Sequence, residues 1–317
     1  MINYSIIIPH KNIPDLLQRC LDSIPVRDDV QVIVVDDNSD ADKVDFEHFP
    51  KWNGEDYELY LTKEGKGAGY ARNIGLKHAK GEWVLFADAD DYYFKENLNV
   101  LFELQFPETS VVVWKSKRKM LDGNDEYIGE ILETGENSGF VTCHTPEKLY
   151  SEYTMPWTRL IRRRHIETNN IVFEEVRYSN DEMFSARLGA SVMSYDYVDL
   201  LVYCQECRQG SLKESPSLDN YLCRWNVWLR KARFLEKQAR PCKSDRWLSS
   251  RIIDISYPAF LRMQIKKARF LGLRRTWRDY SVFCMSIGID RIPYLTKCKR
   301  KLLKKKMLWN RGLCCQS

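Results

Sequence analysis

The sequence lacks any hydrophobic run long enough to cross a membrane as a helix. Such a helix needs about 18 to 20 consecutive apolar residues, and no stretch approaches that length. The N-terminus also lacks the basic segment of a secretory signal, and the apolar run nearest to it, residues 6–8, is too short for a signal core. These absences argue against a helical membrane protein, and we expect a protein that is not exported.

A cysteine framework and a dinucleotide-binding motif are also missing. The ten cysteines are scattered, and the pair Cys204 and Cys207 has no second close pair with which to bind zinc. The glycine cluster at residues 65–69 fails the pattern Gly-x-Gly-x-x-Gly, because its third glycine would fall on Tyr70 or Arg72. We therefore expect free thiols and no dinucleotide site of this type.

Negative charge is scarce only in the last third of the chain. Residues 1–221 hold 24 Lys+Arg against 39 Asp+Glu, whereas residues 222–317 hold 25 against 5, which together give the net charge of +5. A split of this kind indicates that the two parts face different partners. A chain of 317 residues has room for a large domain and an appendage.

Short β-branched runs alternate with helical patterns in the first two thirds of the chain. Residues 5–9 predict a buried strand that ends at Pro9, residues 15–24 carry apolar side chains at helical spacing, and residues 31–35 predict a second strand. Strand, helix and strand within about thirty residues form a βαβ unit with parallel strands. Further strands are expected near residues 57–61, 110–114, 192–197 and 200–203. The pattern predicts an α/β fold with an open, twisted, mostly parallel sheet flanked by helices.

The run from Trp83 to Asp91 is the most informative stretch. Five apolar residues, typical of a buried strand, lead directly into Asp88, Asp90 and Asp91. Ligands of open α/β sheets bind beyond the carboxyl ends of the strands, and two acids in an Asp-x-Asp pattern can share one Mg²⁺ or Mn²⁺ ion. A solvated acidic turn is the alternative.

Two further helix starts carry candidate residues. A helix expected over residues 68–79 would present its N-terminal amides and Arg72 to a phosphate, or Arg72 would lie on a solvated face. Asp181 begins a later helix, where it would be either a functional acid or an ordinary cap. Residues 155–170, with three consecutive arginines, are expected to form an amphipathic helix.

Taken together and in order, these segments resemble the family-2 glycosyltransferases of the GT-A fold, in particular the bacterial enzymes that assemble surface polysaccharides. The resemblance covers roughly the first 210 residues. The matching segments are residues 6–9, 34–39, 69–75, 81–91, 157–160 and 180–182.

The resemblance implies a role for each matching residue. Pro9, Asp36 and Asp37 would line the nucleotide site, with the two acids contacting the base and ribose. Arg72 and Asn73 would flank the donor on their helix. Asp88 and Asp90 would bind the metal and the diphosphate, and Asp181 would be the general base that takes the acceptor's proton. Arg208 would meet the diphosphate.

The activity implied is an inverting, metal-dependent transfer of one sugar from a nucleotide-diphosphate donor, expected to be UDP-linked, to a surface-polysaccharide or lipid-linked glycan. Mn²⁺ or Mg²⁺ is the expected cofactor. The chain departs from the family where Asn180 replaces the usual Glu before the base. It also lacks the Gln-x-x-Arg-Trp motif of processive members, so single additions are expected. A nucleotidyltransferase of similar fold and a non-catalytic sugar-binding scaffold are the alternatives.

The extent of this resemblance and the charge distribution together predict the division into domains. Residues 1–215 are expected to form the nucleotide-sugar-binding catalytic domain, and residues 216–317 a basic helical region. Aromatic and aliphatic side chains interleave with Lys and Arg in residues 259–317, which suits a helix lying on an anionic membrane surface. A solvated basic face is the alternative, and nucleic acid is not expected as a partner. The predicted location is the cytoplasmic face of the plasma membrane.

Overall fold

The computed structural model describes residues 1–53, 55–121, 126–132, 149 and 155–207, together with helical residues 220, 223–224, 226–227, 230–231 and 234. These residues belong to a first compact unit, Met1–Ala239, which extends beyond the boundary expected at residue 215; a second unit comprises Arg240–Ser317. Arg208 and the basic segment 259–317 lie outside the described residues. Their roles at the diphosphate and at a membrane surface therefore stay predictions.

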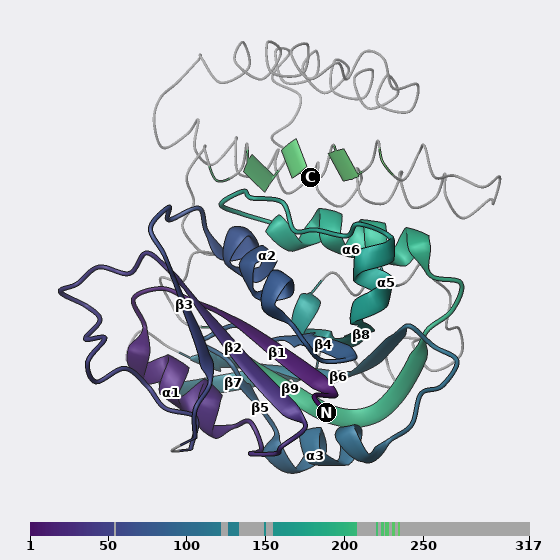
Figure 1. The fold of residues 1–317 in the computed structure, drawn as a ribbon, viewed down its shortest axis with the longest axis horizontal. Coiled ribbons are helices and arrows are strands. Elements are labelled where there is room, and N and C mark those ends of the chain that lie inside the picture. The colour runs from purple at the N-terminus through teal and green to yellow at the C-terminus, as the bar shows by residue number, and fades with distance from the viewer. Residues whose placement is uncertain are drawn as a thin grey trace, which may run out of the picture. The chain divides into compact units, whose positions relative to one another are not determined.

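Nine strands from the described residues form a single sheet (Figure 1). In chain order they are β1 (Tyr4–His10), β2 (Val30–Asp37), β3 (Glu58–Thr62), β4 (Trp83–Phe86), β5 (Tyr92–Tyr93), β6 (Val111–Leu121), β7 (Tyr127–Leu132), β8 (Arg159–Arg162) and β9 (Asp196–Cys207). The helices are α1 (Pro14–Asp22), α2 (Ala68–His78), α3 (Lys95–Glu103), α5 (Arg163–Thr168) and α6 (Asn180–Ser191), and Pro156–Thr158 forms the 3-10 turn η3.

The sheet is mixed. Its order is β3-β2-β1-β4-β8-β6-β9-β5, with β7 paired to β6. The pairs among β3, β2, β1 and β4 are parallel, as is β6 with β9, whereas β8 and β7 run antiparallel to their neighbours. The predicted α/β fold with a mostly parallel sheet flanked by helices is confirmed, because six of the nine strands, β1, β2, β3, β4, β6 and β9, run in one direction. Residues 122–126 are too few for the crossover that parallel neighbours need, so β6 and β7 form a hairpin.

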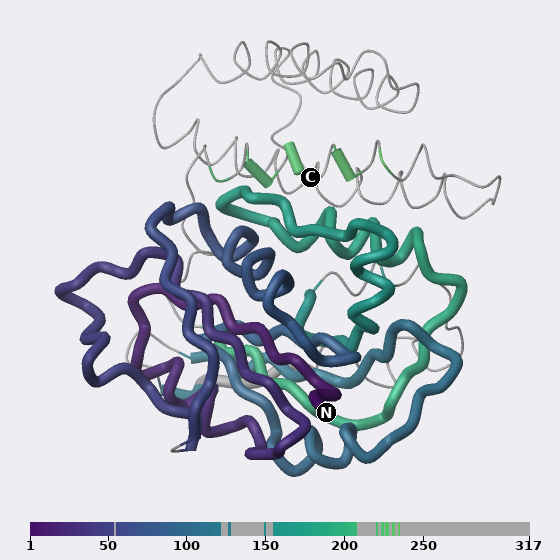
Figure 2. The backbone as a smooth tube through the Cα atoms, in the orientation of Figure 1, coloured from purple at the N-terminus to yellow at the C-terminus, as the bar shows by residue number. Residues whose placement is uncertain are grey.

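Side chains alternate between two apolar layers along the central strands. Ile6 and Ile8 of β1 pack in the layer that contains α1 and α3, whereas Ile7 packs in the layer that contains α2, α5 and α6. Figures 1 and 2 show these two groups of helices on opposite sides of the sheet. Both faces of β1, β2 and β4 are therefore covered, which explains why these strands are almost entirely apolar.

Pro9 lies inside β1 and does not end it. The backbone oxygen of Ile7 accepts a hydrogen bond from Ala87 N at 3.1 Å, so Ile7 and Pro9 both turn their backbone groups toward β4. Because β4 ends at Phe86, the missing N–H of Pro9 faces no ladder partner and costs no hydrogen bond. The strand continues to His10, which pairs with Asp36.

Two segments differ from the expected secondary structure. Residues 192–203 were expected to hold two strands, but β9 is continuous from Asp196, with register shifts opposite Trp114 and Lys115 that absorb the irregularity. Residues 155–170 do not form one amphipathic helix, because η3 and β8 precede the short helix α5. Strand β8 is buried between β4 and β6, and tertiary pairing has overridden the helical pattern there.

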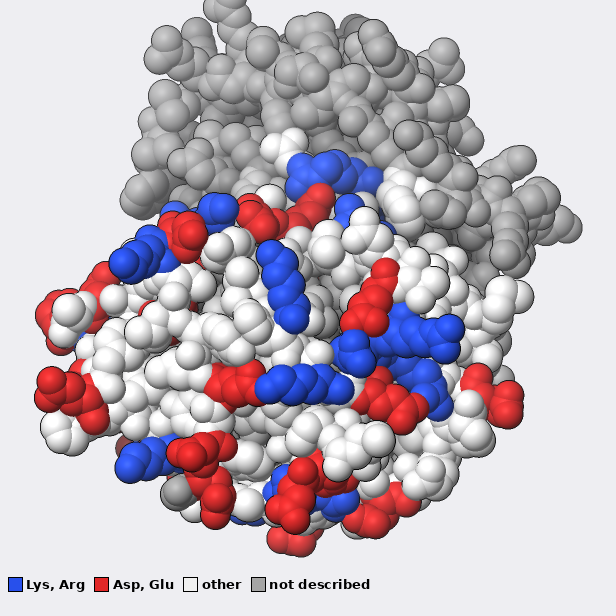
Figure 3. Space-filling view, viewed as in Figure 1, with Lys and Arg blue, Asp and Glu red and all other residues white. Residues whose placement is uncertain are grey.

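The surface of the described part carries both charge signs. Lys and Arg side chains are interspersed with Asp and Glu over the face seen in Figure 3. Among the described residues, we find no helix that is both long and apolar enough to cross a membrane.

Replacing Gly81 by Ala should destabilise the fold. A Cβ at this buried position would lie 2.6 Å from Ser5 N and 2.7 Å from Tyr4 C, which are backbone atoms of β1 that cannot move independently. We expect the free energy of unfolding to fall by about 1 to 3 kcal/mol, as in other overpacked cores, measured by urea denaturation. Lys77→Ala, an exposed change on α2, is the control and should stay within about 0.5 kcal/mol of the parent. Equal midpoints for both variants would contradict this packing account.

Candidate active site

The carboxyl ends of three parallel strands meet at one edge of the sheet. β1 ends at His10, β2 at Asp37 and β4 at Phe86, and each is followed by a polar loop. Crevices of this kind are where open α/β sheets bind ligands. The candidate side chains come from β1 and β2, from the turn after β4, from α2 and from the first turn of α6.

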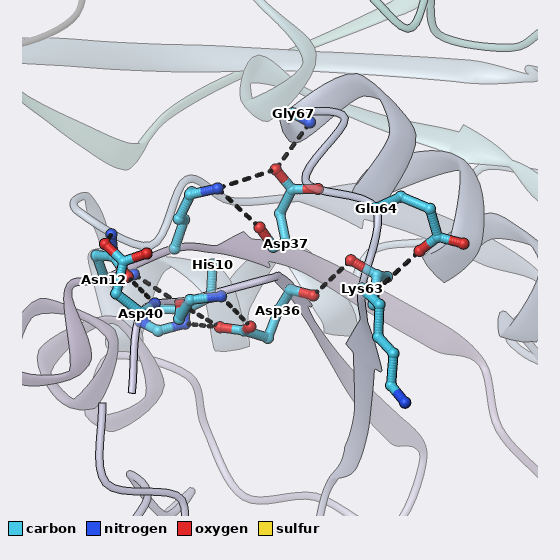
Figure 4. Close-up of polar contacts among 11 residues, drawn as sticks. His10, Asn12, Asp36, Asp37, Asp40, Lys63, Glu64 and Gly67 are labelled. Carbon is cyan, nitrogen blue, oxygen red and sulfur yellow. Dashed lines mark hydrogen bonds and ion pairs between the residues drawn. The ribbon is translucent and has the colours of Figure 1, made fainter. Parts of the chain in front are cut away.

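Both carboxylate oxygens of Asp36 are bound by protein groups (Figure 4). Ser39 donates from its backbone N to Oδ1 at 2.8 Å and from its hydroxyl to Oδ2 at 2.5 Å. His10 Nδ1 lies 2.8 Å from Oδ2, and because His10 Nε2 accepts from Ile13 N, Nδ1 carries the proton. Burial acts to raise the pKa of Asp36, but these hydrogen bonds hold it below its usual value. The buried side chain thus has a structural role, which disfavours the expected contact with base or ribose.

Asp37 keeps one buried oxygen without a hydrogen-bond partner. Its Oδ2 accepts from Gly67 N at 2.7 Å, whereas Oδ1 has no partner among the described residues (Figure 4). Gly67 has φ of 93°, in the left-handed region that favours glycine. Lys11 Nζ donates to the backbone oxygen of Asp37 at 3.0 Å. Burial raises the pKa of Asp37. An unpaired buried acceptor is costly, so Oδ1 is the atom to which a ligand donor would bind.

Asp88, Asp90 and Asp91 lie close enough to share one ion. A carboxylate oxygen from each residue lies within 4.8 Å of those of the other two. Oxygen ligands about 2.0 to 2.6 Å from a divalent cation can be separated by this distance, so the three acids fit Mg²⁺ or Mn²⁺. Asp88 and Asp90 are partly exposed, whereas Asp91 is buried.

Asp91 anchors this acidic turn to β9. Tyr203 donates its hydroxyl to Asp91 Oδ2 at 2.9 Å, and Glu206 donates its backbone N to Oδ1 at 2.9 Å. The same hydroxyl accepts from Asp88 N at 2.9 Å. Burial, followed by the charges of Asp90 and Asp88, raises the pKa of Asp91 well above its usual value. Asp91 therefore holds the turn, and Asp88 and Asp90 are the candidate metal ligands.

Arg19 supports the same turn from α1. It donates from one terminal nitrogen to Asp90 O and from the other to Glu206 Oε2, each at 2.7 Å. Lys119 Nζ lies 3.1 Å from the other Glu206 oxygen. The buried Glu206 carboxylate is thus balanced by two cations, and the backbone of the turn is fixed.

Arg72 links the acidic turn to the start of α6. Its guanidinium donates to Asp88 Oδ1 at 2.5 Å and to Asn180 Oδ1 at 2.7 Å, and it lies 5.3 Å from the ring centre of Phe173. Arg72 is only 5% exposed, so the alternative of a solvated arginine is wrong.

The side-chain amide of Asn73 binds the backbone that precedes α6. Its Nδ2 donates to Phe173 O at 3.0 Å, and its Oδ1 accepts from Phe173 N at 2.9 Å. Both polar groups of the side chain are therefore used to hold the backbone before α6. This arrangement disfavours a direct contact with the donor.

Asp181 lies in the first turn of α6, after Ser179 in a left-handed conformation with φ of 57°. Burial, and next the charge of Glu182, raises the pKa of Asp181 to about 6, although Arg72 acts to lower it. A carboxyl with this pKa is mostly ionised at neutral pH and is still basic enough to accept a proton. The chemistry suits a general base.

Two further candidates add no described polar side chain. Pro9 lies in β1 and has an apolar side chain, and Arg208 is outside the described residues. Cys204 and Cys207 are three residues apart on β9 and so face opposite sides of the strand. Among the described residues, only the Asp88 cluster groups three potential metal ligands closely enough for one ion.

The supporting residues Arg19, Tyr203 and Glu206 were not predicted. Arg19 and Glu206 carry no local signal, because their partners are distant in sequence. Tyr203 belongs to an apolar run and looks like an ordinary core residue. A buried tyrosine needs a partner for its hydroxyl, which was the one available signal.

Comparisons with known proteins give one consistent result. Residues 5–171 match the sequence model of the family described as glycosyl transferase family 2. The chain is 29% identical over 209 residues to the poly(ribitol-phosphate) beta-glucosyltransferase of Bacillus spizizenii, covering 62% of this chain and 32% of that one. It is 31% identical over 233 residues to glycosyltransferase GlyA of Streptococcus pneumoniae, covering 66% of this chain and 31% of that one. It thus spans about a third of these relatives.

The fold also has solved counterparts. The crystal structure of S. aureus TarS 1–349 in complex with UDP-GlcNAc superposes with a TM-score of 0.63 at 22% identity, covering 93% of this chain and 82% of that one. At this level of identity, the likeness establishes the fold alone.

Tyr203→Phe should loosen the acidic turn. The change removes the hydroxyl that donates to the buried Asp91 and accepts from Asp88 N. The Asp91 carboxylate and the Asp88 N–H would each lose this hydrogen bond. We expect the free energy of unfolding to fall by about 1 to 3 kcal/mol, measured by urea denaturation. Tyr127→Phe, at an exposed tyrosine, is the matched control and should be close to neutral. A Tyr203→Phe protein as stable as the control would show that the hydroxyl does not hold the turn.

Proposed function

Because this chain belongs to glycosyl transferase family 2, we propose that it transfers a single sugar from a UDP-sugar donor to a surface-polysaccharide or lipid-linked glycan acceptor, with inversion and with the help of a divalent metal. One observation carries the proposal. A buried unpaired acceptor on Asp37 and the acidic pair Asp88 and Asp90 follow the carboxyl ends of the parallel strands β2 and β4, and a carboxyl of raised pKa on Asp181 lies at the start of α6.

The nucleotide preference is argued from Asp37. Gly67 N occupies Oδ2, so one buried oxygen remains to accept one N–H. The pairing edge of uracil offers one ring N–H between two carbonyl groups, and the ammonium of Lys11 lies near enough to meet a carbonyl. The TarS protein that shares this fold binds UDP-GlcNAc. Both points support a UDP-sugar donor.

The donor diphosphate is assigned to the acidic turn. Asp88 and Asp90 would hold Mn²⁺ or Mg²⁺, and the bound ion would balance the charge that develops on the leaving diphosphate. The protein's own contribution is to fix these two acids, through Arg72 on Asp88 and through the anchoring of Asp91.

Asp181 is assigned to the acceptor. As the acceptor oxygen bonds to the anomeric carbon and the bond to the diphosphate breaks, the acceptor hydroxyl proton passes to the Asp181 carboxylate. This single displacement inverts the anomeric configuration and needs no covalent enzyme intermediate. Family membership favours this reaction over the nucleotidyltransferase and scaffold alternatives.

A glycan acceptor is supported by the relatives. The Bacillus spizizenii and Staphylococcus aureus proteins with which the chain aligns act on poly(ribitol-phosphate). Residues 222–317 hold 25 Lys+Arg against 5 Asp+Glu, which supports sugar transfer at the anionic cytoplasmic face of a membrane.

Asp181→Asn should abolish transfer and retain donor binding. The amide cannot accept the proton, so we expect kcat to fall by roughly 10² to 10⁴ fold, with the Kd for the UDP-sugar within a factor of two, roughly 0.4 kcal/mol. In the parent, kcat/KM should fall as the pH drops through about 6, because the base becomes protonated below its pKa. Asp56→Asn, at an exposed acid, is the control. A variant that still turns over at the parent rate rules out Asp181 as the base.

Asp90→Asn should weaken metal binding. We expect the apparent Kd for Mn²⁺, followed by the paramagnetic signal of the free ion, to rise by at least tenfold, which is about 1.4 kcal/mol. Donor affinity should then no longer respond to a chelator. Asp42→Asn, at an exposed acid of the loop after β2, serves as control. Donor binding that is insensitive to a chelator in the parent protein would argue against a metal at this turn.

A further inference from the structure

Residues beyond the sheet contact the loop that precedes α6, the helix whose first turn carries Asp181. Cys223 Sγ lies 3.8 Å from Tyr178 O, and the Arg224 guanidinium lies 5.3 Å from the ring centre of Tyr178. Arg230 donates from Nε and from a terminal nitrogen to the two carboxylate oxygens of Glu174, at 2.9 and 2.7 Å. The first unit therefore includes this segment, which was expected to belong to a separate basic region.

These contacts have helical spacing. Residues 220, 224, 227, 231 and 234 are all helical and recur at intervals of three and four, so they share one face. On this face Asn220, Val227 and Lys231 are 6%, 0% and 4% exposed. The face is thus packed, although the segment as a whole is strongly basic.

Lys231 makes the contact nearest to the catalytic carboxyl. Its ammonium lies 2.5 Å from Glu182 Oε2, and both side chains are largely buried, at 4% and 15% exposed. A lysine is almost never buried without a partner, and removing one partner of a buried pair leaves an uncompensated charge. Glu182 directly follows Asp181 in the first turn of α6.

We propose that Lys231 is a positioning residue of this active site: it neutralises Glu182 and so keeps the adjacent Asp181 in the ionised form that accepts the acceptor's proton. The proposal rests on the function assigned to Asp181 above. It makes the segment after the sheet part of the catalytic machinery.

The charges around Asp181 come from three directions. Glu182 lies on the same helix, Arg72 approaches from α2, and Asp88 from the turn after β4. Lys231 adds a cation through Glu182. Glu182 disfavours ionisation of Asp181, whereas Arg72 favours it. Removing Lys231 would leave the Glu182 charge unbalanced beside Asp181, and a second negative charge at close range raises a carboxyl pKa.

The test follows the Asp181 carboxyl directly in metal-free protein. Protein with ¹³C-labelled aspartate side chains is titrated by NMR, and Asp181→Asn identifies the resonance. Lys231→Met should move the Asp181 titration upward by roughly one pH unit, whereas Lys231→Arg should leave it near the parent value. Arg230→Met removes a cation from the same segment, but its partner is Glu174, so it should cause no shift.

If Lys231→Met does not fold, Glu182→Gln tests the proposal from the other partner of the ion pair. This change removes the negative charge beside Asp181 and leaves the Lys231 ammonium in place, so the Asp181 titration should move below that of the parent. In the double variant, Glu182→Gln should cancel the upward shift caused by Lys231→Met, which a merely structural role of Lys231 would not produce.

Activity gives the second readout. The acid limb of the kcat/KM profile should move upward with the NMR titration in Lys231→Met, with rates equal to the parent at high pH. An NMR shift without any effect on transfer would disprove the role of Asp181 as the general base. The electrostatic effect of Lys231 on the Asp181 titration would still stand. An Asp181 titration that is the same in the parent, Lys231→Met and Glu182→Gln would overturn the proposal.

Discussion

Repulsion between carboxylates is the constraint around which this sheet edge is built. Parallel strands deliver their carboxyl ends to one place. The end of β2, the turn after β4 and the start of α6 carry Asp36, Asp37, Asp88, Asp90, Asp91 and Asp181. Charges this close cannot all remain ionised unless each has a compensating partner. Asp36 is compensated by His10 and Ser39, and Asp88 by Arg72. Asp37 and Asp181 are compensated incompletely, and their pKa values are raised. These two are the residues whose remaining acceptor capacity suits substrate.

The fold could be predicted from the sequence to the extent that its signals are local. The continuous β-branched runs, the apolar side chains at helical spacing and the short βαβ connection predicted β1, α1 and β2, because each of these signals lies within a few neighbouring residues. Strand β8 was missed, because its pairing with β4 and β6 depends on residues some 50 to 80 positions away. The arginine-rich pattern around it looked helical, and burial in the sheet decided otherwise.

The residue types of the site could be predicted, but the role of each residue could not. Asp36 and Asp37 are adjacent and chemically identical, and they point to opposite sides of β2. The positions of His10, Ser39 and Gly67 decide that Asp36 is bound on both oxygens and Asp37 on one. Asp91 is a similar case: its partner Tyr203 is 112 residues away, so its anchoring role could not be read from the acidic run itself.

The departure at Asn180 fits the same electrostatic constraint. Asn180 gives Arg72 a neutral acceptor at 2.7 Å, so the arginine charge is shared with one carboxylate, Asp88. A glutamate here would divide that charge between two acids and add a negative charge directly before Asp181, which would raise its pKa further. With Glu182 already on the other side of Asp181, a neutral residue at position 180 limits the number of negative charges beside the Asp181 carboxyl. Asparagine thus keeps the hydrogen bond that fixes Arg72 and adds no second acidic neighbour to Asp181.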